Sequence, residues 1–512
     1  MRLKTVAGAV LAAVLCLPGS TAAWAGGGHG GLVARTDKGL VQGARDHGVD
    51  NFLGIRYAAA PVGNLRWRAP QPAKAWSGIA DATRFGNRCA AAASTNGPRT
   101  EAEDCLFVNV QRPSGVRQGE KLPVYVFIHG GGLVNGSSNQ ADMDAIVRQT
   151  GVVGVSFNYR LGVLGFLGLS GLTAEAGESG NYGFQDQQAA LRWIQRNIAA
   201  FGGDPRRVTV GGESAGGWSV CGHLTAPGSK GLLARAMMQS GSCYSRTQED
   251  AETAGTQLAT AVGCGEAATS VTCLRETPVG TLIDAPSGGF ALVRGTPTLP
   301  RDPAESVANG QFARVPVVTG ANRDEGRTFA QGFIGANEQA YVDWTNSTFG
   351  DRAAAVRERY PWPATSDQFT AAYVIGAIMT DSGLIVGIGG CTQRQLTRDL
   401  ARWTTTYAYE FGHRTGPGLT PIPGYVWGAG HAAELAYLFP SFDNGTPIAP
   451  TFNAAERRLA RDMKNYWATF VRGAGPWPRY DGRVLQLRAG GRSGTITDRQ
   501  YVAEHQCDFW ST

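Results

Sequence analysis

A single pentapeptide constrains the fold of this chain more than any other feature. It reads Gly212-Glu213-Ser214-Ala215-Gly216 and lies between the apolar run at residues 208–210 and a segment that begins at Trp218. A G-x-S-x-G sequence between a strand and a helix forms a sharp turn, in which the glycines leave room for the backbone and the serine oxygen stays accessible to a substrate carbonyl. The motif alone is weak evidence in a chain with 71 glycines, so its meaning depends on the surrounding pattern.

Short apolar runs that alternate with helical patterns indicate the fold class. The runs at residues 122–128, 152–157 and 315–319 are apolar as expected for strands covered on both faces. Residues 184–198 carry apolar side chains at helical spacing and end at Gly202-Gly203. This order predicts an α/β fold with a mostly parallel central sheet, helices on both faces and long loops at 284–300 and 412–424. Ligands of such sheets meet the carboxyl ends of the strands, where the serine turn also lies.

The first 25 residues have the pattern of a signal peptide. Arg2 and Lys4 precede an apolar stretch at 6–17, and Ala23-Trp24-Ala25 is a small-x-small cleavage sequence. The stretch is too short for a stable membrane anchor, and a large residue before Cys16 disfavours lipidation. The sequence therefore predicts a secreted protein whose residues 26–512 form one domain. The 47 basic and 41 acidic residues nearly balance, which argues against nucleic-acid binding.

Eight cysteines remain after the predicted signal peptide. An even number in an exported protein suggests four disulfides, although spacing alone allows 105 pairings and some cysteines could be free thiols. A metal site is disfavoured because there is no Cys-x₂-Cys pair and no cluster of Cys and His. The eight are Cys89, Cys105, Cys221, Cys243, Cys264, Cys273, Cys391 and Cys507.

A serine nucleophile needs a base, normally a histidine oriented by a carboxylate. In α/β hydrolases the chain order is serine, acid, histidine, which leaves His413, His431 and His505 as candidates. His431 lies in a glycine-containing stretch before an apolar run, a suitable setting for a base on a loop. If a neutral histidine is the base, activity should rise through about pH 6–7.

A second requirement of acyl transfer is a site for the oxyanion. The sequence His129-Gly130-Gly131-Gly132 follows a predicted strand, and glycines there can direct backbone N–H groups at one point without a Cβ in the way. The alternative is a simple turn, but a G-x-S-x-G motif about 80 residues later favours an oxyanion hole.

At this point the chain resembles the type-B carboxylesterase/lipase family of α/β hydrolases, which includes cholinesterases and bacterial para-nitrobenzyl esterases. The resemblance covers nearly the whole chain after the predicted signal peptide, and its motifs follow in family order. They lie at residues 52–58, 61–66, 103–106, 158–162, 180–188 and 201–205.

The resemblance implies a role for particular residues. Ser214 matches the nucleophile and His431 the base, while Glu325 matches the acid. Composition cannot choose between Glu325 and the adjacent Asp324, so this assignment depends on the resemblance alone. Ser240 resembles a serine that helps to hold the acid. The positions that match oxyanion donors are Gly131, Gly132 and Ala215, and the family disulfides map onto Cys89–Cys105, Cys264–Cys273 and Cys391–Cys507, which leaves Cys221 to pair with Cys243 by arithmetic.

Two departures argue against a cholinesterase. The segment at 90–104, inside the first disulfide, has no choline-binding tryptophan, and the segment at 241–245 lacks the acyl-pocket tryptophan of the family. The sequence thus predicts a secreted serine carboxylesterase that acts on small-molecule esters through an acyl-enzyme and needs no cofactor. A serine peptidase of the same fold would need a further domain, and a catalytically dead adhesion protein of the family would lack the serine.

Overall fold

The strand at residues 122–128 shows why the core of this protein has two halves. In this strand, β6 (Leu122–Ile128), Val124 and Val126 pack into one hydrophobic cluster, whereas Tyr125 and Phe127 pack into a second one. Successive side chains of a strand point to opposite faces of its sheet, so an apolar strand has to be covered on both. The computed structural model, which describes residues 32–117, 119–420, 422–442 and 447–510, has such cover on either side of one large sheet.

The sheet is mostly parallel, as the sequence predicts. Its other strands are β1 (Leu32–Arg35), β2 (Leu40–Asp46), β3 (Val49–Arg56), β4 (Ile79–Asp81), β5 (Phe107–Pro113), β7 (Val153–Phe157), β8 (Gly203–Glu213), β9 (Arg235–Gln239), β12 (Val317–Asn322), β13 (Thr406–Phe411), β14 (Arg483–Leu487) and β15 (Gly494–Thr497). Among the described residues these make 13 strands in the order β1-β2-β3-β5-β7-β6-β8-β9-β12-β13-β14-β15, with β4 beside β2. Neighbours from β7 to β14 are parallel, while the other pairs along this order are antiparallel.

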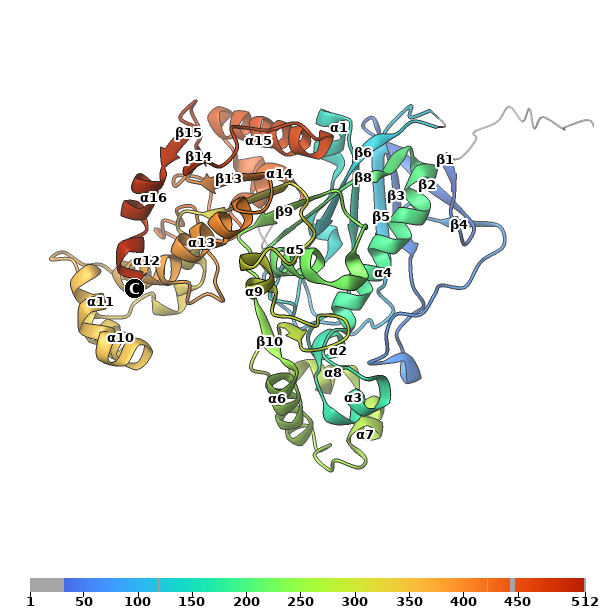
Figure 1. Cartoon of the computed structure of the whole chain (residues 1–512), viewed down its shortest axis with the longest axis horizontal. Helices are drawn as coiled ribbons and strands as arrows, with labels where there is room; N and C mark the ends of the chain where they lie inside the picture. Colours follow the sequence, from blue (N-terminus) through green and yellow to red (C-terminus); the bar gives the residue numbers. More distant parts are fainter. Residues whose placement is uncertain (1–31, 118, 421, 443–446, 511–512) are drawn as a thin grey trace, which may run out of the picture. The chain divides into compact units, whose positions relative to one another are not determined.

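Helices cover the two faces of this sheet (Figure 1). Leu191 and Val220 belong to the cluster that contains Val124, whereas Val147 and Trp467 belong to the cluster that contains Tyr125. The fold is therefore the α/β-hydrolase arrangement that the sequence predicts. The four helices that carry these residues are α4 (Tyr182–Asn197), α5 (Ala215–Thr225), α1 (Asp144–Thr150) and α15 (Ala454–Arg472).

Shorter helices build the segments around the sheet. A third hydrophobic cluster, which includes Leu172, Leu258, Leu274 and Leu282, joins helices that lie together in Figure 1. These are α3 (Ser170–Ala176), α6 (Gln248–Ala261), α7 (Ser270–Glu276) and α8 (Val279–Asp284), and the remaining helices are α2 (Gly162–Phe166), α9 (Pro303–Ala308), α10 (Glu338–Phe349), α11 (Ala353–Arg359), α12 (Thr370–Ser382), α13 (Gly390–Ala401), α14 (Leu435–Leu438), α16 (Asp498–Glu504) and α17 (Cys507–Trp510).

Two of the predicted elements need correction. The strand expected at 315–319 begins only at Val317, because Pro316 has no N–H to contribute to a ladder. The predicted loop at 284–300 contains β11 (Leu292–Arg294), which pairs in parallel with β10 (Ser245–Thr247) in a separate two-stranded sheet. Three-residue strands are too short to produce a recognisable period in the sequence.

All eight cysteines that follow the predicted signal peptide form disulfides. The pairs are Cys89–Cys105, Cys221–Cys243, Cys264–Cys273 and Cys391–Cys507. The described part of the chain contains no helix that is both long and apolar enough to cross a bilayer.

Candidate active site

Ser214 lies at the tip of a tight turn between β8 and α5. Its φ of 56° and ψ of −124° place it in a left-handed region that residues other than glycine rarely adopt. The flanking glycines permit this turn: a Cβ on Gly212 would come within 2.5 Å of the Gly216 backbone, and a Cβ on Gly216 would overlap the carbonyl of Ile128. The turn therefore holds Ser214 at the carboxyl end of β8, where a ligand can approach.

Glu325 and His431 lie beside this turn and are hydrogen-bonded to each other. His431 Nδ1 is 2.6 Å from Glu325 Oε2, and both side chains are buried. Glu325 follows β12, and its other oxygen accepts hydrogen bonds from Ser240 Oγ at 2.5 Å and from the N–H of Asn322 at 2.6 Å. Three donors thus fix the carboxylate of Glu325 in one orientation.

Asp324, the competing carboxylate, points elsewhere. Its two oxygens accept hydrogen bonds from the Arg414 guanidinium at 2.8 Å each, and Oδ2 also accepts from the N–H of Ala429. The N–H of Asp324 donates to the carbonyl of Ala429 in return. Asp324 thus holds the loop that carries His431, whereas Glu325 contacts the imidazole itself.

Further hydrogen bonds join the segment after β12 to the His431 loop. Asn322 Nδ2 donates to the carbonyl of Gly430 at 2.8 Å, and Thr328 Oγ1 donates to the carbonyl of His431 at 3.2 Å. The N–H of His431 donates to the carbonyl of Glu325 at 3.4 Å. Glu325 and His431 are therefore held by one shared set of hydrogen bonds between their two segments.

Three backbone N–H groups near Ser214 are unused. Gly131 and Gly132 have φ values of 100° and 63°, which glycine adopts without strain. Ala215 is the first residue of α5, where an N–H has no partner within the helix. Within the described ranges, none of these three N–H groups donates to a protein acceptor. They are free to bind an oxyanion at the turn.

The other side of His431 faces a carboxylate that the sequence reasoning missed. His431 Nε2 is 3.2 Å from Glu213 Oε1, and no hydrogen bond joins it to Ser214 Oγ in the described structure. Nucleophile and base often come into hydrogen-bond distance only when substrate binds. Glu213 occupies the first variable position of G-x-S-x-G. The motif therefore does not predict its contact with a histidine 218 positions later.

Burial and charge shift the pKa values of this pair. Burial lowers the pKa of His431, but the negative charges of Glu213, Glu325 and Glu434 outweigh it and raise the value to about 9. Burial also raises the pKa of Glu213 to about 8, an effect that the charge of His431 opposes. These carboxylates raise the pKa of His431 above the ordinary 6–7 assumed from the sequence, because the sequence does not reveal how many carboxylates surround the imidazole.

The two other candidate histidines also have carboxylate partners, but they lie elsewhere. His413 Nε2 is 3.2 Å from Glu456. His505 lies between Asp381 and Glu410, with both contacts at 2.7 Å. A carboxylate partner alone therefore does not identify the base. Of the three, only His431 lines the cavity that contains Ser214.

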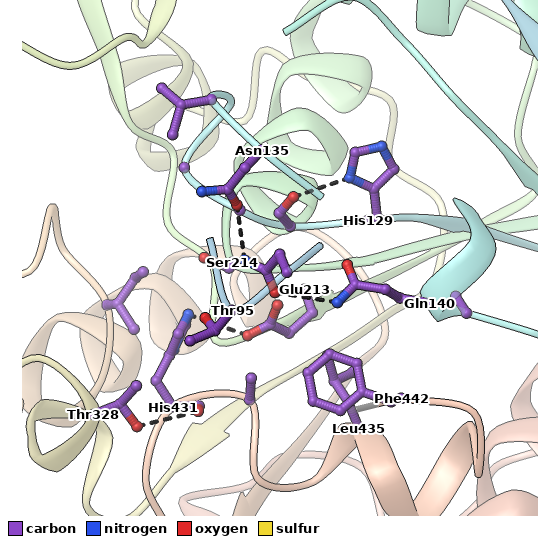
Figure 2. A pocket seen from close by; sticks show the side chains of 18 of the residues that line it. Thr95, His129, Asn135, Gln140, Glu213, Ser214, Thr328, His431, Leu435 and Phe442 are labelled. Atoms are coloured by element: carbon purple, nitrogen blue, oxygen red, sulfur yellow. Dashed lines mark hydrogen bonds and ion pairs between the residues drawn. The ribbon is translucent and has the colours of Figure 1, made fainter. Parts of the chain in front are cut away.

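That cavity has a volume of about 400 Å³, within the range of small-molecule sites. Figure 2 shows Ser214, Glu213 and His431 around it, with Gln140, Leu435 and Phe442 on another side. Its wall is mainly apolar. The apolar lining includes Phe127, Val134, Trp218, Phe329, Ile385, Val386, Ile388, Leu435, Phe439 and Phe442.

Trp218 is a wall residue whose position the sequence reasoning did not use. It lies one helical turn after Ser214 on α5, and its indole packs on Tyr244 with ring centroids 5.1 Å apart. Tyr244 belongs to the 241–245 segment, which lacks the tryptophan of the family. An aromatic wall is therefore present, but it comes from α5. The i to i+4 spacing from Ser214 is the signal that could have identified it.

Comparison with known proteins agrees with this geometry. A model of the carboxylesterase family matches residues 31–510. A cocaine esterase of Oryctolagus cuniculus is 33% identical over 525 residues, which cover 94% of this chain and 95% of that protein. A fumonisin B1 esterase of Sphingopyxis macrogoltabida is 33% identical over 497 residues (91% and 87% covered), and an acylcarnitine hydrolase of Rattus norvegicus is 33% identical over 504 residues (89% and 87% covered).

The family match spans almost all of the described chain, and these relatives are covered over most of their length. The serine turn and its cavity lie within the matched residues. The protein therefore belongs to the carboxylesterase family and is a carboxylic ester hydrolase with an α/β-hydrolase fold.

Proposed function

We propose that this protein is a secreted serine carboxylesterase whose catalytic residues are Ser214, Glu325 and His431. The observation that carries the proposal is the 2.6 Å hydrogen bond between Glu325 and His431 Nδ1 beside the Ser214 turn. This bond leaves Nε2, the other ring nitrogen, on the side of the cavity. A carboxylate on Nδ1 is the orientation in which the imidazole can accept a proton at Nε2.

The proposed reaction is a two-step acyl transfer. His431 accepts the proton of Ser214, and the serine oxygen attacks the ester carbonyl to form a tetrahedral intermediate. The N–H groups of Gly131, Gly132 and Ala215 stabilise its oxyanion, an effect worth about 10²–10³ in rate for one such donor. His431 then protonates the departing alcohol, and the acyl group remains on the serine. Water, deprotonated by His431, releases the acid and restores the serine.

Ser240 is proposed as a positioning residue in this scheme. Its hydroxyl donates to the carboxylate oxygen of Glu325 that does not face His431. The hydrogen bond keeps the second oxygen directed at Nδ1 of His431. Ser240 would thus act on the reaction only through Glu325.

Export and a single catalytic domain are part of the proposal. The predicted signal peptide, residues 1–25, lies outside the described residues. Four disulfides support an oxidising compartment, since such bonds persist mainly in exported proteins. The described residues after position 31 form one compact unit, which supports one domain over 26–512.

Covalent labelling tests the nucleophile. A fluorophosphonate should label the wild-type protein, and p-nitrophenyl acetate should be hydrolysed. Ser214→Ala should lose labelling and lose activity by several orders of magnitude while remaining folded. Ser347→Ala, at an exposed position on α10, is the matched control and should retain both. Labelling that persists in Ser214→Ala would reject the assignment, and an unlabelled, inactive wild type would favour the adhesion alternative.

A further inference from the structure

Three carboxamide side chains form a hydrogen-bonded chain in the wall of the cavity. Gln140 Nε2 donates to Asn96 Oδ1 at 3.3 Å, and Asn96 Nδ2 donates to Asn135 Oδ1 at 2.7 Å. All three residues line the cavity that contains Ser214. In Figure 2, Gln140 and His431 lie on opposite sides of Ser214. We call Gln140, Asn96 and Asn135 the amide wall.

The direction of these hydrogen bonds leaves one free group at each end. Asn135 Nδ2 has no acceptor, and Gln140 Oε1 has no donor, among the residues that the structure describes. Neither atom belongs to the set that is fully buried without a partner, so both keep some exposed surface, and both residues line the cavity. An unused donor and an unused acceptor therefore occur in the same wall. A hydroxyl group complements both, because it donates one hydrogen bond and accepts others.

The amide wall is held rigidly next to the oxyanion turn. The N–H of Asn135 donates to the carbonyl of Gly131 at 3.1 Å. Asn96 lies in the loop closed by Cys89–Cys105, where Arg88 Nη1 donates to the carbonyl of Asn96 at 3.2 Å. The next residue, Gly97, has a φ of 145°, and the Arg88 guanidinium occupies the place where a Cβ would lie. These contacts fix the wall before substrate binds, which reduces the entropy cost of recognition.

The charges around the cavity indicate that the bound group is uncharged. No Lys or Arg belongs to the described lining of the cavity, and Glu213 is its acidic residue. A carboxylate or phosphate on the substrate would find no Lys or Arg there, and the imidazole of His431 is already paired with Glu325 and Glu213. An alkyl chain against the wall would leave the free amide groups without the water that they lose on binding, and unpaired polar groups are costly.

We propose that the amide wall binds an uncharged hydroxylated part of the ester substrate. The inference rests on the proposed function and adds the class of substrate: esters that carry a free hydroxyl near the scissile bond. The hydroxyl can belong to the alcohol, as in a partial ester of a polyol, or to the acyl group, as in a hydroxy acid. The chemistry of recognition is the same in both cases.

Two matched pairs of esters test this substrate class. For the alcohol, kcat/KM is measured for glyceryl monobutyrate and for propyl butyrate. For the acyl group, it is measured for ethyl 3-hydroxybutyrate and for ethyl butyrate. The hydroxylated member of at least one pair should be preferred by about three- to tenfold, the effect of one uncharged hydrogen bond. The pair that shows the preference identifies the part of the substrate that meets the wall.

Substitutions in the wall test which residues are responsible. Gln140→Leu and Asn96→Leu should each reduce the preference for the hydroxylated ester at least about threefold. Gln331→Leu is the matched control, since Gln331 lines the same cavity but donates through Nε2 to the carbonyl of Thr328 at 2.7 Å. It should retain the preference. Gln140→Met, which is closer in shape to glutamine, replaces the leucine variant if that fails to fold.

The outcomes separate this inference from the proposed function. A wild type that hydrolyses all four esters without preference would overturn the amide wall and leave the esterase assignment intact. A preference that survives at full size in both Gln140 and Asn96 variants would also overturn it. A wild type that neither hydrolyses these esters nor reacts with a fluorophosphonate would overturn the proposed function and the inference together.

Discussion

Substitution of each of the two adjacent carboxylates after β12, Glu325 and Asp324, should have a very different effect on kcat. In Glu325→Gln, the position of Oε1 must remain an oxygen, because the N–H of Asn322 donates to it and cannot turn away. The amide nitrogen then takes the position of Oε2, which faces His431 Nδ1 at 2.6 Å in the native protein. Two donors would meet there, so the imidazole has to place its proton on Nε2. In that tautomer Nε2 cannot accept the proton of Ser214.

The expected loss in kcat follows from this change of tautomer. An equivalent Asp→Asn change in a serine protease costs about 10⁴ in kcat, so Glu325→Gln should reduce kcat by about 10²–10⁴. Asp324→Asn keeps an oxygen for the N–H of Ala429 and weakens the ion pairs with Arg414, whose side chain is 45% exposed, and with Arg327 at 3.8 Å. Such a pair contributes about 0–1 kcal/mol, so kcat should fall by less than about tenfold.

Steady-state hydrolysis of p-nitrophenyl acetate by the two variants measures this difference. Both proteins are first compared by urea denaturation, so that unequal folding does not enter the ranking. Burst-phase measurements with the same substrate separate acylation from deacylation. If Asp324→Asn lost more activity than Glu325→Gln at matched stability, the acid would be Asp324 and the role given to the Glu325–His431 hydrogen bond would be refuted.

Three further predictions concern pH, stability and substrate size. The kcat/KM of the wild type should rise with pH and reach half of its maximum near pH 9, the pKa of His431. Glu213→Gln should move this midpoint to lower pH because it removes a negative charge next to Nε2. A midpoint that does not move would contradict the charge argument. His505→Gln should cost about 3–5 kcal/mol of unfolding free energy at pH 7, because it leaves two buried carboxylates without their cation. Burial lowers the pKa of His505, but those carboxylates raise it to about 10. The stabilisation is therefore complete only below the unfolded-state pKa of about 6.5 and is lost as pH rises through about 10. Urea denaturation should show that the difference in unfolding free energy between wild type and variant shrinks over this range. Trp218→Ala should enlarge the cavity. In a series of p-nitrophenyl esters, the ratio of kcat/KM for a longer ester to kcat/KM for the acetate should rise by about fourfold for each methylene that the new space accepts. An unchanged chain-length profile would exclude Trp218 as a size limit.

Local patterns were sufficient to predict the centre of the fold. Strands β6 and β7 are mainly apolar runs, β8 contains the apolar run at 208–210, and the turn at Ser214 has its own motif, so all of them can be predicted from a few neighbouring residues. At one edge of the sheet, β1, β2 and β3 pair antiparallel, β4 pairs in parallel with β2, and these strands are partly exposed. Strands β10 and β11 are three residues long each. Their pairing depends on contacts between distant segments, which periodicity does not reveal.

The candidate site also contains some residues that the sequence predicts and others that only the folded structure reveals. Ser214 could be predicted from its motif. The choice of Glu325 over Asp324 required a family resemblance, because composition does not distinguish two adjacent carboxylates. The structure separates the two by direction, one side chain toward His431 and the other toward Arg414. The contact of Glu213 with His431 was not predictable, since it joins the end of β8 to a loop that meets it only in the folded chain.

The hydrogen bonds between residues 322–328 and residues 429–431 have a consequence for evolution. Because the segment after β12 holds residues 429–431 directly, the spacing of the acid and the imidazole does not depend on the path that the chain takes from β13 to that point. Insertions, deletions and drift in the loop at 415–420 can therefore accumulate while Glu325 and His431 keep their separation. A lineage with this arrangement can vary that loop without first losing and then regaining the Glu325–His431 hydrogen bond.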